Sequence, residues 1–138
     1  TMEIANRDGI KITNLFEHII AVFKKYNIGK IVGHNVSFDL NVIKSEMFRY
    51  MRKKQLVNFP ILRAFEKVPY FCTMKSTVDI CKLPNPNFPN KFKYPKLSEL
   101  YKNIFNKEAV DLHNSMNDAI YTLDCLIELY NYDLIKLF

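Results

Sequence analysis

The strongest constraint on the fold is a short apolar run that leads directly into a turn and then into a helix. Residues 30–33 are typical of a buried strand, and the Gly-His-Asn sequence at its end predicts a turn. Ser37 is a candidate helix cap, and apolar residues then recur at helical spacing to about residue 57. Residues 70–74 are a second candidate strand. Strands that alternate with helices predict an α/β fold.

Three further segments carry a helical pattern of apolar residues, at about 14–27, 95–105 and 114–130. Residues 75–81 predict a short helical turn before a proline-rich loop, and Asn114 or Ser115 is a candidate cap for the last helix. The chain has 138 residues, of which 49% are hydrophobic. This length and composition predict one domain, residues 1–138.

No run of residues is apolar for the roughly 18 positions that a membrane span needs, so no membrane partner is expected. The three cysteines, Cys72, Cys81 and Cys125, form no C-x-x-C pair, and no signal peptide opens the chain. They are therefore expected to be reduced thiols of an intracellular protein. A cytoplasmic location is the first expectation, and a nuclear location or a viral coding origin stays open.

Basic charge is concentrated in the middle of the chain. Residues 49–96 carry 11 basic and two acidic side chains, whereas residues 97–138 carry three basic and seven acidic ones. Lys91, Lys93 and Tyr94 lie within the basic segment. Because lysines neutralise phosphates and aromatic rings stack on unpaired bases, these three residues are candidate contacts for a single-stranded nucleic acid. The alternative is a solvated, lysine-rich surface.

Two clusters of residues are candidates for chemistry. The first follows the strand at residues 30–33 and places Asp39 on the first turn of a helix, where open α/β sheets bind their ligands. A purely structural role is the alternative, because a carboxylate there is favoured by the helix dipole. The second cluster places His113 just before the last helix and Asp118 about one turn inside it. This arrangement suits a general base beside a metal site, and a surface histidine next to a helix cap is the alternative.

Taken together, the two clusters resemble a known family. The G-H-N-x-x-F-D sequence that ends at Asp39 and the H-N-x-x-x-D-A sequence that begins at His113, about 75 residues further along, resemble the second and third motifs of the DEDDh exonucleases. Residues 72–75 and 93–101 resemble the segment that joins these motifs in bacterial and viral members. The resemblance implies a ribonuclease H-like fold.

The activity that this resemblance implies is 3′-to-5′ hydrolysis of a nucleic acid to nucleoside 5′-monophosphates by a two-metal mechanism, with DNA as the first expectation for the substrate and RNA left open. It implies Mg²⁺ or Mn²⁺ at Asp39 and Asp118 and assigns the general base to His113. It also places His34, Asn35 and Phe38 beside the substrate path, although core packing is an equal alternative for Phe38. The implied partners are a single-stranded 3′ end of DNA or RNA and a DNA polymerase.

The family's first motif, D-x-E on an N-terminal strand, does not occur in this sequence. Glu3 and Asp8 are poor substitutes. The expected domain is therefore an exonuclease domain that lacks three N-terminal strands and two of four metal carboxylates. We expect low activity unless those strands or a partner chain complete the site. We also expect an uncovered apolar helix face and an unpaired sheet edge.

A second hypothesis needs no catalysis. A truncated, inactive relative could keep the basic surface and bind single-stranded nucleic acid or a partner protein. The presence of Asp39, His113 and Asp118 in one chain favours the enzyme, because a binding module does not need these three residues together.

Overall fold

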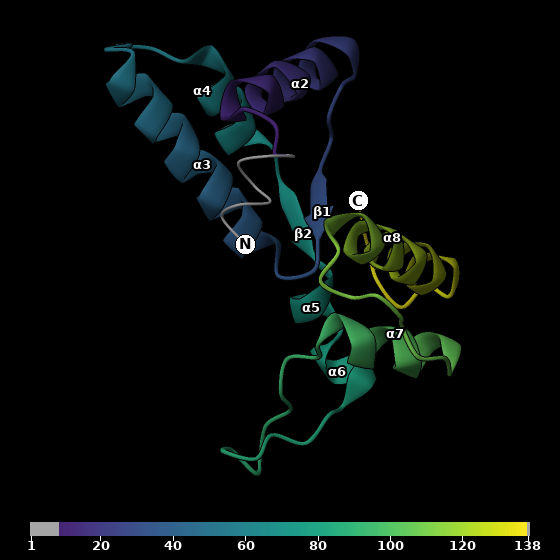
Figure 1. Ribbon diagram of the computed structural model, residues 1–138. Helices are drawn as coiled ribbons and strands as arrows, with labels where there is room; N and C mark the ends of the chain where they lie inside the picture. The colour runs from purple at the N-terminus through teal and green to yellow at the C-terminus, as the bar shows by residue number, and fades with distance from the viewer. Residues whose placement is uncertain (1–8, 138) are drawn as a thin grey trace. The chain divides into compact units, whose positions relative to one another are not determined.

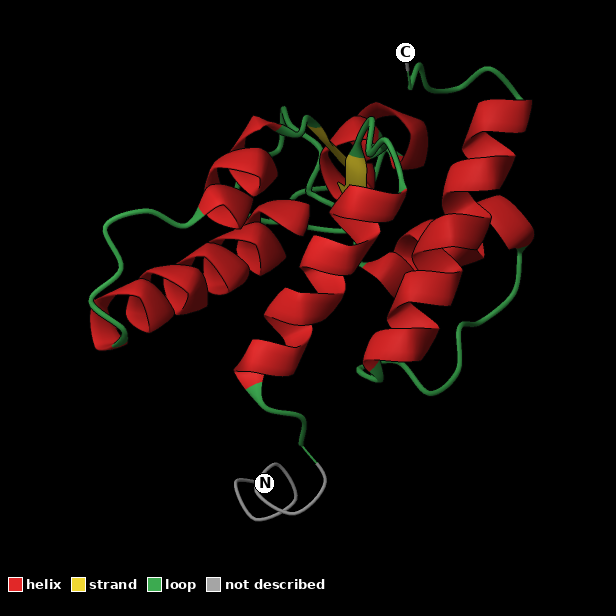
Figure 2. Cartoon of the chain, turned by 90° about the horizontal axis from the view of Figure 1, so that it is seen from above, coloured by secondary structure: helices red, strands yellow, loops and turns green. Residues whose placement is uncertain are grey.

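The protein is described by a computed structural model that covers residues 9–137 and divides into two compact units. The first unit contains residues 9–31 and 38–69, and the second contains residues 32–37 and 70–137. Helices make up most of the described chain, and the two strands are short (Figures 1 and 2). Each unit has its own buried residues and is described separately.

The first unit is helical and is built from three elements: α2 (Ile12–Lys25), most of α3 (Val36–Lys53) and α4 (Pro60–Lys67). Pro60 occupies the start of α4, where its missing N–H costs no helical hydrogen bond. The rings of Phe16, Tyr50 and Phe59 contact one another with centroid distances of 5.5–5.8 Å. Further side chains of the unit are buried, namely Leu40, Met47, Ile61, Leu62 and Phe65.

The second unit contains the sheet, except for the first residue of β1, and the remaining helices. Strands β1 (Ile31–Gly33) and β2 (Tyr70–Cys72) form a two-stranded sheet. Two short helices follow β2, namely α5 (Thr73–Ser76) and α6 (Val78–Cys81), and a long loop leads to α7 (Leu97–Phe105) and α8 (Ser115–Asn131). The core of this unit is formed by Cys81, Leu100 and Cys125, with Leu83, Tyr101, Ile104 and Phe105 packed against them.

Burial controls the chemistry of the cysteines. All three are free and buried, as expected for reduced thiols. Desolvation raises the pKa of the Cys125 thiol to about 12 and also raises the pKa of Cys81. Both thiols are therefore protonated and unreactive at neutral pH, and they act as small apolar core groups.

Helix α8 is apolar on two sides. One side buries Thr122, Cys125 and Leu129. The other side exposes a stripe of large apolar residues at helical spacing, Met116, Ile120, Leu123, Ile127 and Tyr130. This exposed stripe agrees with the uncovered apolar surface expected for a sheet of two strands.

The α/β class predicted from the sequence is confirmed, with mostly helices and a small sheet. One local prediction is wrong, since Ser37 does not cap α3, which already begins at Val36. Residues 60–67, for which no helix or strand is predicted above, form α4, because its apolar side chains are buried in the first unit. Within residues 9–137, no helix has the length and apolar character needed to cross a membrane.

Candidate active site

The turn after β1 is shaped by its small and polar residues. A Cβ at Gly33 would lie 3.0 Å from the Cβ of the buried Val36, so a larger residue would displace the start of α3. Asn35 has a positive φ of 63°, a conformation that asparagine adopts more readily than most residues. The turn therefore places His34 directly at the carboxyl end of β1.

The imidazole of His34 is held by hydrogen bonds at both ring nitrogens. Its Nε2 lies 3.0 Å from the carbonyl oxygen of Pro95, and its Nδ1 lies 3.1 Å from Oγ1 of Thr73. Because a carbonyl oxygen only accepts, Nε2 must donate, which leaves Nδ1 of the neutral ring as the acceptor from Thr73. His34 thus links the turn after β1 to the start of α5 and to the segment before α7.

Burial lowers the pKa of His34. The hydrogen bond to the Pro95 carbonyl and the negative charge of Asp118 act in the opposite direction but are the smaller influences. The neutral ring is therefore the stable form at pH 7. A substrate contact through His34, as predicted from the sequence, would have to use its carbon edge or replace one of these two bonds.

Asp39 occupies the fourth residue of α3 and is exposed. Within the described chain no residue forms a hydrogen bond or an ion pair with its carboxylate. Both oxygens are thus open to a ligand. Phe38, beside it, has 65% of its surface exposed, so the alternative of core packing for Phe38 is wrong. Asn35 is also exposed.

The second cluster lies on α8 and on the loop before it. Asn114 caps α8, since its side chain accepts a hydrogen bond from the backbone N–H of Met116 at 3.0 Å, as predicted. The carboxylate of Asp118 accepts a hydrogen bond from the backbone N–H of His113 at 3.2 Å. The first turn of α8 therefore fixes the backbone of His113.

Two further contacts attach the same loop to α8. The amide of Asn117 donates to the carbonyl of Asp111, and the hydroxyl of Tyr121 bonds both the N–H and the carbonyl of Val110. In contrast, the ring of His113 is exposed and forms no hydrogen bond with any residue in 9–137. The loop thus presents a free imidazole on a fixed backbone.

The metal pair implied by the DEDDh resemblance can be tested against these carboxylates. Asp39 and Asp118 offer hard oxygen donors of the kind that Mg²⁺ and Mn²⁺ prefer, and one oxygen of Asp118 is already bonded to His113. Among the described residues, no group of three or more His, Cys, Asp or Glu residues is close enough to hold a metal. The donor type of each carboxylate fits the ions that the resemblance implies. Glu3 and Asp8 lie outside the described residues.

The basic segment before α7 divides into bound and free lysines. Lys93 pairs with Glu99 at 2.5 Å, and the other oxygen of Glu99 accepts from the backbone N–H of Lys96 at 2.8 Å. Partial burial raises the pKa of Glu99, but the bonds and charges of these two lysines outweigh it, so the pKa is lowered overall. Lys91 and Tyr94, by contrast, are exposed.

Three residues that support the site were not predicted as site residues, namely Thr73, Pro95 and Glu99, although they lie within the segments 72–75 and 93–101 that resemble the family's joining segment. Their partners lie 39, 61 and six residues away along the chain. Thr73 also directly follows β2, and this position beside a strand end is a further indication.

A family model described as an exonuclease of the RNase T type matches residues 5–126. A search of curated proteins and a search of solved structures gave no match. The matched residues include both clusters, the two strands and most of α8.

Proposed function

The chain belongs to the exonuclease family of the ribonuclease H-like superfamily, and we propose that it acts as a 3′-to-5′ exonuclease of the DEDDh type. The substrate is a nucleic-acid strand, DNA in preference to RNA, and the products are nucleoside 5′-monophosphates. The observation that carries the proposal is the free imidazole of His113, whose backbone is fixed by Asp118.

His113 is the general base in this proposal. It takes a proton from the attacking water as the water oxygen bonds to phosphorus, and the bond from phosphorus to the 3′ oxygen breaks. The departing 3′ oxygen gains a proton from solvent. An exposed ring without protein partners can approach the water, whereas a ring such as that of His34, bonded at both nitrogens, cannot.

Asp39 and Asp118 would hold the divalent ions, Mg²⁺ or Mn²⁺, which supply stabilisation of the charge that develops on the reacting phosphate. Asp118 has a second role, since the same carboxylate positions the backbone of the base. Replacement of Asp118 should therefore impair both the metal site and the placement of His113. The metal site of the DEDDh family, as proposed here, uses two further carboxylates besides Asp39 and Asp118.

The test is a nuclease assay on the longest form of the protein that contains this chain. A single-stranded DNA oligonucleotide and its RNA counterpart, each labelled at the 5′ end, are incubated with Mg²⁺ or Mn²⁺. We expect stepwise shortening from the 3′ end, release of 5′-monophosphates, faster cleavage of DNA, and complete loss of activity with EDTA. Asp118→Asn should be inactive.

His18→Ala is the matched control for the histidines, because His18 is exposed on α2 and bonds only the carbonyl of Asn14. This variant should cleave at the unmodified rate. An inert protein in the presence of either metal, or cleavage that persists in EDTA, contradicts the proposal.

A second candidate function is supported by the incomplete ligand set of the described residues. An inactive relative would bind a single strand or a partner protein without cleaving it. In that case strand binding persists in Asp39→Asn and Asp118→Asn and weakens when Lys91 is reversed in charge, while no condition yields monophosphates.

A further inference from the structure

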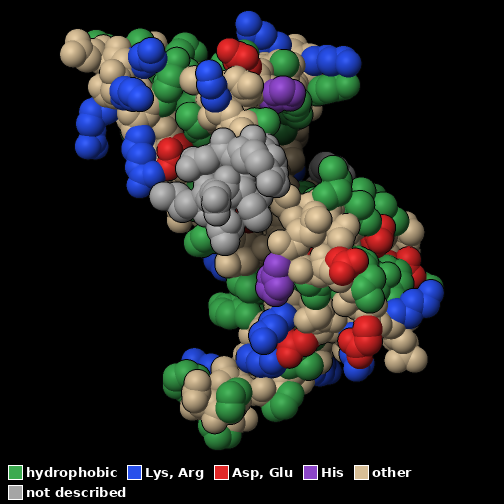
Figure 3. Space-filling view, viewed as in Figure 1, with side chains coloured by type: hydrophobic (Ala, Val, Ile, Leu, Met, Phe, Trp, Pro, Cys, Tyr) green, Lys and Arg blue, Asp and Glu red, His purple; other side chains and the backbone are tan. Residues whose placement is uncertain are grey.

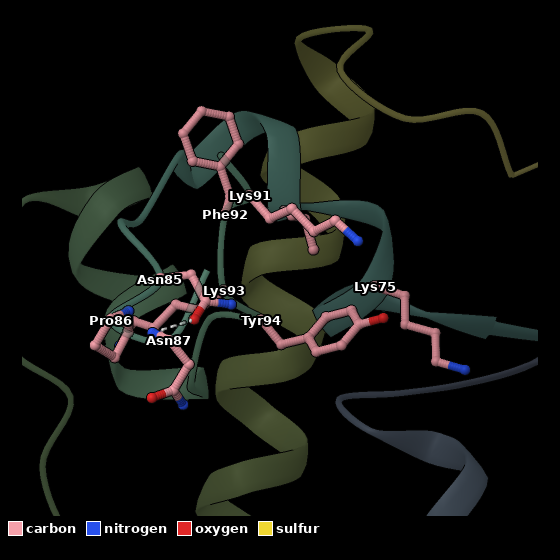
Figure 4. A pocket seen from close by; sticks show the side chains of 9 residues that line it. Lys75, Asn85, Pro86, Asn87, Lys91, Phe92, Lys93 and Tyr94 are labelled. Carbon is pink, nitrogen blue, oxygen red and sulfur yellow. Dashed lines mark hydrogen bonds between the residues drawn. The ribbon is translucent and has the colours of Figure 1, made fainter. Parts of the chain in front are cut away.

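The second unit contains a pocket of about 610 Å³ beside the long loop that joins α6 to α7. The residues that matter for the argument are Lys75 from α5 and Asn87, Lys91, Phe92, Lys93 and Tyr94 from the loop. In Figure 4 the side chains of Lys75, Lys91 and Tyr94 point to the same side, and Asn85, Pro86 and Asn87 lie across from them. Neither Asp39, His113 nor Asp118 lines this pocket.

The loop that forms the pocket has a defined conformation. Pro84 and Phe92 form an antiparallel bridge, and the N–H of Lys93 donates to the carbonyl of Leu83 at 3.0 Å. At the tip, the side chain of Asn85 accepts hydrogen bonds from the N–H groups of Asn87 and Phe88. The lining residues are therefore positioned before any ligand binds, which reduces the entropy lost on binding.

The charge of the pocket is positive and partly uncommitted. Three lysines and no acidic residue line it. Lys93 is paired with Glu99, whereas among residues 9–137 neither Lys75 nor Lys91 forms an ion pair. Two ammonium groups are thus available to an anion, and Lys93 instead fastens the loop to α7.

Aromatic surface lies next to these charges. Tyr94 is 60% exposed and Phe92 is 43% exposed, and neither ring contacts another aromatic ring of the described chain. The backbone N–H of Asn87 is bonded to Asn85, but its side-chain amide forms no hydrogen bond among the described residues. This side chain is therefore available to bond the polar edge of a base. Figure 3 shows lysine side chains beside hydrophobic ones on this part of the second unit. Free ammonium groups can bind a phosphate, and an exposed ring next to them can stack on a base. A nucleotide carries both of these groups.

We propose that this pocket binds one unpaired nucleotide within a nucleic-acid strand. Lys75 and Lys91 bind its phosphates, and the ring of Tyr94, with Phe92, stacks on its base. The base must be unpaired, because in a duplex its faces are covered by neighbouring base pairs. The inference rests on the proposed exonuclease function in one respect, namely that the bound nucleotide lies upstream of the 3′ end that reaches His113.

The test measures binding without cleavage. A 5′-labelled twelve-residue oligothymidylate is titrated with the protein in EDTA, and binding is followed by fluorescence anisotropy at several salt concentrations. We expect Tyr94→Ala to weaken binding about 5- to 100-fold, in the range expected for removing one base stack, and Tyr94→Phe to keep most of it. Lys75→Glu and Lys91→Glu should weaken binding and reduce the salt slope by about 0.7 for each phosphate that is no longer neutralised.

Lys107→Glu is the matched control, since Lys107 is exposed in the same unit and lies outside the pocket. This substitution changes the net charge by the same amount as Lys75→Glu. It should bind nearly as the unmodified chain does. Equal weakening by Lys107→Glu and Lys75→Glu overturns the proposal, because binding then depends on net charge alone. If the charge reversals unfold the protein, Lys75→Gln and Lys91→Gln, checked by circular dichroism, replace them.

Two other probes distinguish a nucleotide within a single strand from a free nucleotide and from a duplex. Thymidine monophosphate should compete weakly, and a twelve-base-pair duplex should bind less tightly than the single strand. Tighter binding of the duplex, or equal affinity for the free nucleotide and the strand, overturns the proposal. An inert nuclease that still needs Tyr94 for binding would refute the proposed function and leave this inference standing.

Discussion

The two histidines that precede the helices α3 and α8 occupy equivalent positions and are used in opposite ways. His34 and His113 are each followed by asparagine, each lies two residues before its helix begins, and each is five residues before an aspartate on the first turn. The ring of His34 is bonded at both nitrogens, whereas the ring of His113 is free. The same local sequence therefore yields one structural and one reactive candidate.

The difference arises from residues that are distant in the sequence. Pro95 and Thr73 come from the segments before α7 and after β2, and they reach His34 because the turn lies within the second unit. The ring of His113 meets no such partners among the described residues. Its loop bonds to the first two turns of α8 and, through the ion pair of Glu108 with Lys102, to α7. Only the tertiary surroundings separate an imidazole that holds the fold from one that is available to a substrate.

The largest expected effect follows from removing the free ring. His113→Ala should lower the nuclease rate by about 10²- to 10⁴-fold, the usual contribution of a general base, because the backbone bond to Asp118 remains. The midpoint of urea unfolding should not change. The rate is measured with saturating metal at pH 7, and a loss smaller than about tenfold would remove His113 from its assigned role.

A smaller effect is expected when the bonded ring is removed. His34→Ala should lower the free energy of unfolding by about 1–3 kcal/mol, because the Pro95 carbonyl and the Thr73 hydroxyl lose their partner. His34→Gln, which retains a donor for Pro95, should lose less. Urea unfolding followed by circular dichroism measures both, and an unchanged stability of His34→Ala would contradict the structural role.

The partner of His34 provides a third comparison. Thr73 is fully buried, and its hydroxyl also lies 3.4 Å from the carbonyl of Gly33, so Thr73→Val should cost about 1–2 kcal/mol of unfolding free energy. Thr122→Val is the control, since Thr122 is buried without a side-chain hydrogen bond among the described residues. Equal losses in the two variants would show that the bond to His34 contributes nothing.

The smallest effect is a pH dependence. Because the pKa of His34 is lowered in the folded state, the unfolded chain binds more protons between that pKa and about 6.5. The contribution of His34 to stability is therefore complete above about pH 6.5 and is lost as the pH falls through the folded pKa. Urea unfolding at pH 7.5 and pH 5 should show this decline, and His34→Gln should reduce it.

The sequence predicted those features that depend on residues close together along the chain. The α/β order, the strand at residues 30–33 and the Asn114 cap follow from local patterns and are confirmed. Helix α4 was missed, because prolines lie near both its ends and the burial of Ile61, Leu62 and Phe65 supplies its stability. The bonds of His34 and the pairing of Lys93 with Glu99 depend on packing, and no local pattern reveals them.

The three buried cysteines all lie in the second unit, and the first unit contains none. A thiol reagent in solution reaches a buried thiol only when the structure around it opens, so the rate of labelling counts opening events there. Cys125 lies on α8 and Cys72 at the end of β2, and each reports on its own element. The chain thus carries natural probes of local unfolding, with no added label, in the half that contains His113.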